Sequence, residues 1–178
     1  MNINEAEAKK LGFESVDELL LCMDICGFES VPIADRDLLL KQCEDDKIGR
    51  TKKDFIEFMN EHNLIDLFNK VKYLSELERF IEIYNYFYNE LEMSDCILGI
   101  YNRKVKEAKE LFDGEKEEEY SKKAQKLFRQ MERMIQRKNE IACNSFGRLN
   151  NDDQDKFMLY IEALEDHRLD RKHKGRKQ

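Results

Sequence analysis

Histidine, cysteine and paired carboxylates are the residue types in this sequence that could carry out chemistry, and their spacing matches no catalytic pattern. A di-iron helical bundle needs a Glu-x-x-His motif on two helices, but neither His62 nor His167 has a glutamate three residues before it. The sequence also lacks a glycine-rich phosphate loop, a nucleophile elbow and an H-E-x-x-H motif. We therefore expect no catalytic residues, no cofactor and no enzymatic activity.

The five cysteines indicate reduced thiols rather than a metal site. They form no C-x-x-C pair, and no signal peptide precedes them, a combination typical of a cytoplasmic protein. The candidate ligands for a zinc ion would be Cys22, Cys26, Cys43 and His62. Their spacing matches no common structural zinc pattern. Cys22 and Cys26 are four residues apart in an apolar segment, where cysteines usually pack as small hydrophobic side chains. We predict no metal ligands.

A row of basic residues is the first candidate for a recognition surface. Its members follow one another at steps of four, three, four and four on one side of a predicted helix: Lys122, Lys126, Arg129, Arg133 and Arg137. Such a ridge can follow a phosphate backbone. The alternative is an outer face whose bases pair with acids on neighbouring helices, and the net charge of −7 favours that alternative.

The second candidate is an acidic surface in the amino-terminal third. Residues 1–70 contain 9 Lys/Arg and 16 Asp/Glu, whereas residues 71–178 contain 22 of each. Glu44, Asp45 and Asp46 follow a predicted helix at its carboxyl end, where the helix dipole disfavours negative charge. These acids either lie in a solvated turn or face a cationic partner. The charge division predicts a protein partner with a basic surface.

A helix-turn-helix-like element at residues 36–62 is an alternative route to nucleic acid. A turn containing Gly49 separates two predicted helices, and the second opens with Thr51 and then Lys52 and Lys53. Two features weaken this interpretation. The acids at 44–46 would face phosphates, and the second helix carries mainly apolar residues.

The fold class is predicted by two rows of residues spaced seven apart. The first row is Leu77, Tyr84, Leu91, Leu98, Val105 and Phe112, and a second row follows three residues after each of the first five. This pattern is typical of the seam of a packed helix. It predicts an unbroken helix over 71–112, and similar rows predict a second helix over 115–146. Asp113-Gly114 would join them in an antiparallel hairpin, with a last helix after Asn150.

An aromatic run in the first long helix is the third candidate surface. The candidate interface residues are Phe80, Tyr84, Tyr86, Phe87 and Tyr88. Their side chains fall on more than one face of the helix, so the run is either buried from two sides or exposed as a binding patch. Burial between the amino-terminal helices and the long helices is the favoured alternative, and a partner, including a second copy of the chain, is the other.

The sequence predicts an all-α protein in three parts. Residues 1–70 form an acidic module of four short helices, residues 71–172 form a long-helix bundle, and residues 173–178 form a basic tail. Capping patterns place helix starts after Asn4, Ser15 and Thr51, and a third helix near Asp35. The first long helix would reach about 60 Å and the second about 48 Å at 1.5 Å per residue.

These observations favour a non-enzymatic helical interaction protein, an adaptor or an inhibitor. Its partner would be another protein, such as a nucleic-acid-processing complex, and the composition fits an accessory protein of a bacterium or its phage. Nucleic-acid binding through the basic row or through residues 36–62 is the alternative function. No apolar stretch approaches a membrane span, and a homodimer is compatible with the long seam.

Overall fold

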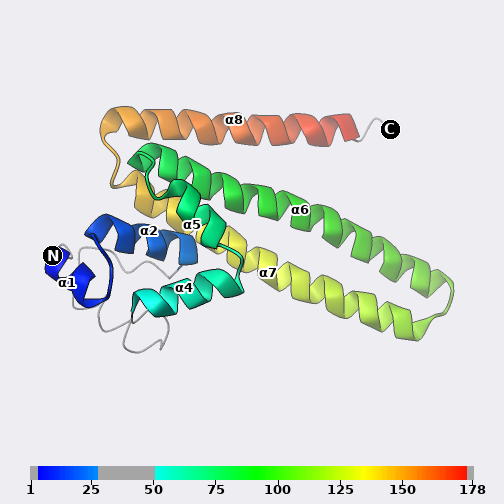
Figure 1. Ribbon diagram of the computed structural model, residues 1–178. Coiled ribbons are helices and arrows are strands. Elements are labelled where there is room, and N and C mark those ends of the chain that lie inside the picture. The colour runs from blue at the N-terminus through cyan, green and yellow to red at the C-terminus, as the bar shows by residue number, and fades with distance from the viewer. Residues whose placement is uncertain (1–3, 28–50, 176–178) are drawn as a thin grey trace.

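The computed structural model describes residues 4–27 and 51–175, with side chains up to Leu169, and this part of the chain is helical without strands. The helices are α1 (Glu5–Lys10), α2 (Val16–Cys26), α4 (Lys52–Glu61), α5 (Ile65–Val71), α6 (Glu76–Glu110), α7 (Gly114–Phe146) and α8 (Asn151–Gly175). Figure 1 shows α6 and α7 as a long antiparallel hairpin, with the short helices at one end. The all-α prediction, a hairpin with a small helical module, is confirmed. The helix expected near Asp35 lies outside the described residues.

Side-chain caps begin the short helices where the sequence predicts them. The Asn4 side chain accepts a hydrogen bond from the Glu7 amide at 3.1 Å, and Ser15 and Thr51 cap α2 and α4 in the same way. Gly27 ends α2 in the left-handed conformation, with φ of +60°. Only a residue without Cβ fits there easily, because an added Cβ would lie 2.6 Å from Cδ of Arg137.

The first long helix begins at Glu76, so the predicted continuous helix from residue 71 is wrong. Ser75 forms a capping box with Glu78: the serine Oγ accepts from the Glu78 amide at 3.3 Å, and the glutamate Oε2 accepts from the Ser75 amide at 3.2 Å. The preceding residues form the separate helix α5. Consequently α6 has 35 residues and α7 has 33. At 1.5 Å per residue their lengths are about 52 and about 50 Å, so the predicted difference in length disappears.

Phe112 is not part of the helical seam, which corrects the last member of the predicted row. It has a φ of +57° and is 96% exposed. Helix α6 ends at Glu110, and the Asp113 side chain then caps α7 by accepting from the Lys116 amide at 3.1 Å. The tight hairpin turn needs a left-handed residue just before that cap, and this geometry turns Phe112 away from the seam.

Two hydrophobic clusters lie against two different faces of the first half of α6. The first cluster joins α6 and α7 to the amino-terminal helices, and its α6 members include Ile83 and Phe87. The second joins α6 to α8 and includes Phe80, Tyr84 and Phe157. In Figure 1 α6 accordingly lies between the short helices and α8, whose carboxyl-terminal part diverges from the hairpin. Beyond these clusters, none of the other described helices covers the hairpin on either side.

A buried carboxylate ties α2 to α4 and to the residue that follows α5. Glu18 Oε1 lies 2.9 Å from the Lys52 ammonium and 3.2 Å from that of Lys72, and its Oε2 accepts from the Glu14 amide at 2.7 Å. Burial by itself raises the pKa of Glu18, but the Glu14 amide and the two lysines outweigh it and hold the pKa below its ordinary value of 4.5. The ionised form is therefore the one that stabilises the fold.

Substituting Glu18→Gln is expected to lower the free energy of unfolding at pH 7 by about 1.5–3 kcal/mol, the value of a hydrogen bond to a charged group. Because the folded-state pKa of Glu18 lies below the unfolded value, the stabilisation is present above pH 4.5 and is lost as the pH falls through the folded-state pKa. Urea unfolding at several pH values should show that the free energy of unfolding falls more steeply from neutral to acid pH in the wild type than in Glu18→Gln. The control is Glu57→Gln, whose exposed pair with Lys53 should contribute less than about 1 kcal/mol.

Candidate functional site

Two of the predicted surfaces fall wholly or partly outside the described residues. Glu44, Asp45 and Asp46 lie there, and so does the first half of the element at 36–62. Its second half is α4, whose apolar side chains pack toward the first cluster, with Phe55 and Met59 buried. Lys52, at the start of α4, is held by Glu18.

The aromatic run of α6 is packed inside the chain. Phe80, Tyr84 and Tyr88 belong to the cluster under α8, and Phe87 belongs to the cluster with the amino-terminal helices. Tyr86 is half-buried at the edge of that same cluster. The Tyr84 ring meets Phe157 edge-on, with centroids 5.9 Å apart. The structure therefore agrees with burial from two sides, the favoured of the two alternatives.

The predicted basic row has two different parts. Lys122 pairs with Glu118 at 2.6 Å, and Arg137 is half-buried, with its guanidinium 5.8 Å from the centroid of the Phe58 ring. Burial lowers the pKa of Arg137. Between them, Lys126, Arg129 and Arg133 are exposed and form no salt bridge with any residue that the structure describes. Within the described chain, these three are the members of the row that neither pair with an acid nor pack on an aromatic ring.

The cysteines of α2 pack into the core. Cys22 and Cys26 are buried, and the Cys22 thiol lies 3.9 Å from the Met59 sulfur. The hydrogen bond with Cys22, together with burial, raises the pKa of the Cys26 thiol, which keeps it protonated. His62 is exposed with its ring against Phe58. Within residues 4–27 and 51–169, no group of three or more His, Cys, Asp or Glu side chains is placed to hold a metal ion.

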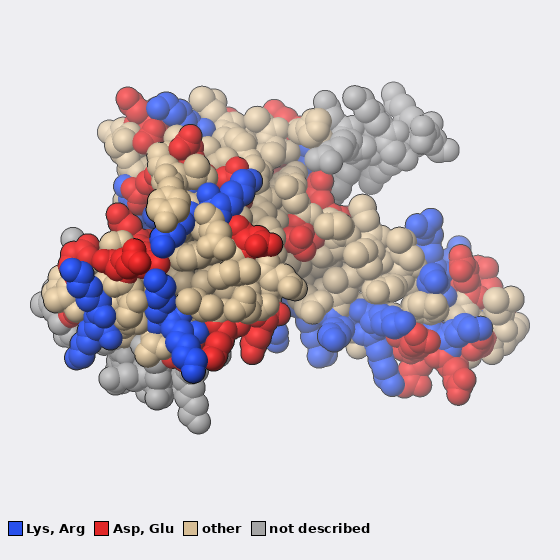
Figure 2. All heavy atoms as spheres, viewed as in Figure 1, with Lys and Arg blue, Asp and Glu red and all other residues tan. Residues whose placement is uncertain are grey.

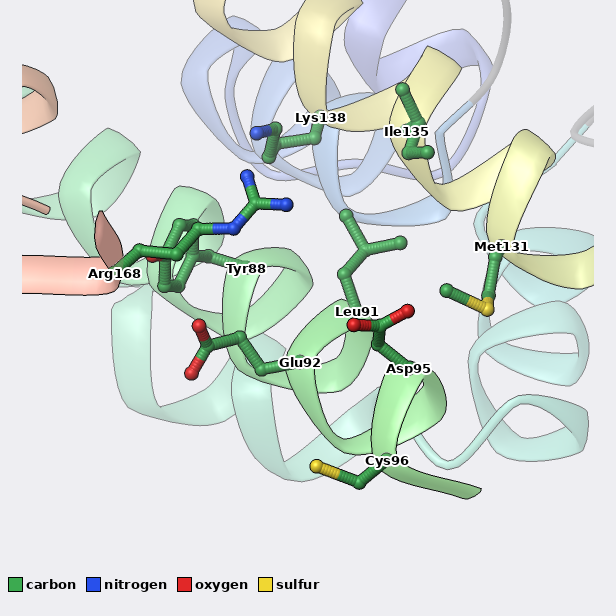
Figure 3. Close-up of a pocket in the computed structure, with 9 residues that line it drawn as sticks. All are labelled: Tyr88, Leu91, Glu92, Asp95, Cys96, Met131, Ile135, Lys138 and Arg168. Carbon is green, nitrogen blue, oxygen red and sulfur yellow. The ribbon is translucent and has the colours of Figure 1, made fainter. Parts of the chain in front are cut away.

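A groove of about 560 Å³ opens where α8 separates from the hairpin. Its lining comes from three helices: Tyr88, Leu91, Glu92, Asp95 and Cys96 of α6, Met131, Ile135 and Lys138 of α7, and Arg168 of α8. Figure 3 shows Arg168 reaching over Tyr88 toward α7. We call this surface the α8 groove. It combines an apolar floor with charged side chains at its edges.

The α8 groove brings aromatic and charged side chains close together. The Lys138 ammonium lies 5.2 Å from the centroid of the Tyr84 ring and 5.7 Å from that of Tyr88. Burial lowers the pKa of Lys138, and the nearby Glu165 carboxylate opposes that shift. No histidine lines the groove, and its one thiol, Cys96, is exposed to solvent. Apolar, aromatic and charged side chains arranged in this way are typical of interfaces.

The opposite flank of the hairpin carries an apolar row that sequence reasoning missed. Met93, Ile97 and Ile100 of α6 are all exposed, at 38–56%. They continue from Tyr86 at steps of seven, four and three, so they lie on the side of α6 that faces the amino-terminal helices. The sequence feature that could have revealed this surface is the row itself, whose apolar residues lie beside the main heptad seam of α6. Figure 2 shows uncharged surface over this part of α6 and basic side chains along α7 beside it.

None of the helices described here has an apolar stretch long enough to span a membrane. Comparison with known proteins found no matching family model, no matching curated protein and no matching solved structure. The site's own geometry is therefore the basis for a functional proposal.

Proposed function

We propose that this chain is a non-enzymatic helical interaction protein, an adaptor or an inhibitor, that binds a protein partner along the α6–α7 hairpin. The observation that carries the proposal is the α8 groove. There the hairpin extends past the helices that cover it and keeps Leu91, Met131 and Ile135 in an open, apolar surface. Apolar surface with a polar rim marks interaction sites on soluble proteins.

The finer identity of the partner follows from charge and composition. An acidic amino-terminal third attracts a basic protein surface, as a nucleic-acid-processing complex would present. We keep Glu44, Asp45 and Asp46 as the candidate contacts on that side. A cytoplasmic accessory protein of a bacterium or its phage remains the proposed setting.

The test uses full-length bait with matched variants in a lysate of the native host. Ile135→Glu places a charge in the α8 groove, and it should fold because Ile135 is 45% exposed. Met158→Glu is the control, since Met158 is 43% exposed on α8 and does not line the groove. For each protein that the wild type and the control capture, the amount captured by Ile135→Glu should be lower by about tenfold or more, as expected for an interface hot spot. Equal capture by all three baits contradicts the proposal.

A second candidate function is nucleic-acid binding by the exposed part of the basic row. Lys126, Arg129 and Arg133 occupy two turns of α7 on one side and have no acidic neighbour within salt-bridge distance in the described chain. Three phosphate contacts would give binding that weakens steeply with salt. Duplex DNA is therefore one arm of the experiment described below.

A further inference from the structure

One flank of the distal hairpin combines an apolar row on α6 with a basic row on α7. The apolar row is Met93, Ile97 and Ile100, and the basic row is Lys126, Arg129 and Arg133. We call the two rows together the distal flank. It is a surface distinct from the α8 groove, whose α7 residues Met131, Ile135 and Lys138 point the other way.

Lys126 and Arg133 of the basic row face the same side as the apolar row, because both rows continue contacts with the amino-terminal helices. Arg129, eight residues before Arg137, lies farther round α7. On α6 the row follows Tyr86, which packs against the first cluster. On α7 the row precedes Arg137, which lies over Phe58 of α4 and against Gly27. Arg133 is one turn before Arg137, and Lys126 is two turns before Arg133. Figure 2 agrees, with uncharged α6 surface bordered by basic side chains of α7.

The charge of the distal flank is not compensated by the described chain. The acids of α7 that form ion pairs lie nearer the hairpin turn, where Glu118 holds Lys122 and Glu119 holds Lys123. From Lys122 to Lys138 the sequence has seven basic residues and one acid, Glu132. Exposed Ile and Met beside unpaired Arg and Lys are the combination that an acidic, partly apolar ligand satisfies.

We infer that the distal flank binds an acidic amphipathic helix of a partner protein, an inference that rests on the proposed function. Each row covers eight residues, 93–100 and 126–133, so its seven steps of 1.5 Å make it about 10 Å long. A helix of two to three turns lying along the hairpin would place its apolar stripe on Ile97 and its neighbours. Carboxylates on one edge of that stripe would then meet the basic row.

The apolar row distinguishes this ligand from nucleic acid. A phosphate backbone needs the basic row and gains little from exposed Ile97 and Ile100, whereas an amphipathic helix needs both rows. Removal of either row should therefore weaken binding of the helix, and only removal of the basic row should weaken binding of a duplex.

The experiment selects ligands from a displayed library of random peptides of about 16 residues, long enough for some four helical turns, on the immobilised full-length chain. Enriched peptides are synthesised with a fluorophore, and their affinities are measured by anisotropy. A fluorescent DNA duplex is measured in the same way with the same variants. We expect them to carry apolar residues at spacings of three and four, flanked by Asp and Glu. Ile97→Gln/Ile100→Gln and Arg129→Ala/Arg133→Ala should each weaken binding by about tenfold or more.

The control is Phe128→Gln, a substitution of an exposed apolar residue on α7 outside both rows, which should change affinity less than about twofold. Peptides without acids, or binding unaffected by Ile97→Gln/Ile100→Gln, would overturn the inference. If binding is instead lost with Ile135→Glu, the α8 groove is the site, so the proposed function stands and this inference fails. If only duplex DNA binds, with dependence on Arg129 and Arg133 alone, nucleic acid replaces the protein ligand. If no peptide is enriched, this inference fails, and the capture experiment with Ile135→Glu decides the proposed function separately.

Discussion

Substituting Phe157→Ala is expected to lower the free energy of unfolding by about 3–5 kcal/mol, the usual cost of removing a buried phenylalanine. Phe157 is 1% exposed and is the α8 residue at the centre of the second cluster. Its ring meets Tyr84 edge-on, and the Tyr88 hydroxyl donates a hydrogen bond to the Leu164 carbonyl at 3.2 Å. The other α8 side chains that pack on this cluster, Tyr160, Ile161 and Leu164, are only partly buried, so Phe157 is the main apolar anchor of α8.

Urea unfolding measures the total loss, and native-state hydrogen exchange identifies the helix that opens. Amides of α8 should exchange faster in Phe157→Ala, while those of α2 keep their protection. Met158→Ala is the matched control, since its side chain is 43% exposed and one residue away; it should change stability by less than about 0.5 kcal/mol. A loss under 1 kcal/mol for Phe157→Ala would show that α8 is not anchored by this residue.

The helices and the hairpin of this fold are specified by short-range sequence patterns, and the sequence therefore predicts them. The heptad rows predict the hairpin because a spacing of seven places all their members except Phe112 along one side of the helix. The caps at Asn4, Ser15 and Thr51 each depend on only three following residues. The start of α6 was missed although Ser75 and Glu78 form the same pattern. Apolar residues precede and follow that pattern, and they favoured one continuous helix over a break between α5 and α6.

The candidate surfaces were less predictable because the exposure of a side chain on the hairpin depends on how much of the hairpin's length each neighbouring helix covers. The aromatic run and the row Met93, Ile97 and Ile100 look alike as apolar positions beside a seam. The first is covered by α8 and the amino-terminal helices, and the second lies beyond them. The α8 groove likewise exists because α8 leaves the hairpin, and no residue spacing encodes that angle. Phe112 is a further case, since the turn overrides its place in the heptad.

Substituting Phe87→Ala should destabilise the amino-terminal helices even though Phe87 belongs to the long hairpin. Its side chain is 3% exposed in the first cluster, together with Ile83, Ile141 and residues of α2 and α4. The expected loss is about 3–5 kcal/mol, from lost apolar burial and the cavity left behind. Because the α6 residues form one side of that cluster, the short helices have no complete core of their own. Amides of α2 and α4 should therefore lose protection in this variant.

The control for this prediction is Phe128→Ala, which removes a phenylalanine from α7 that is 52% exposed and belongs to neither cluster. It should leave stability within about 0.5 kcal/mol of the wild type. Together, Phe87→Ala and Phe157→Ala separate the two faces of α6: the first should open the short helices and the second α8. Identical exchange patterns in the two variants would mean that α6 couples both clusters into one cooperative unit. Unchanged protection of α2 in Phe87→Ala would mean that residues 1–70 form an independent domain, with the hairpin merely resting against it.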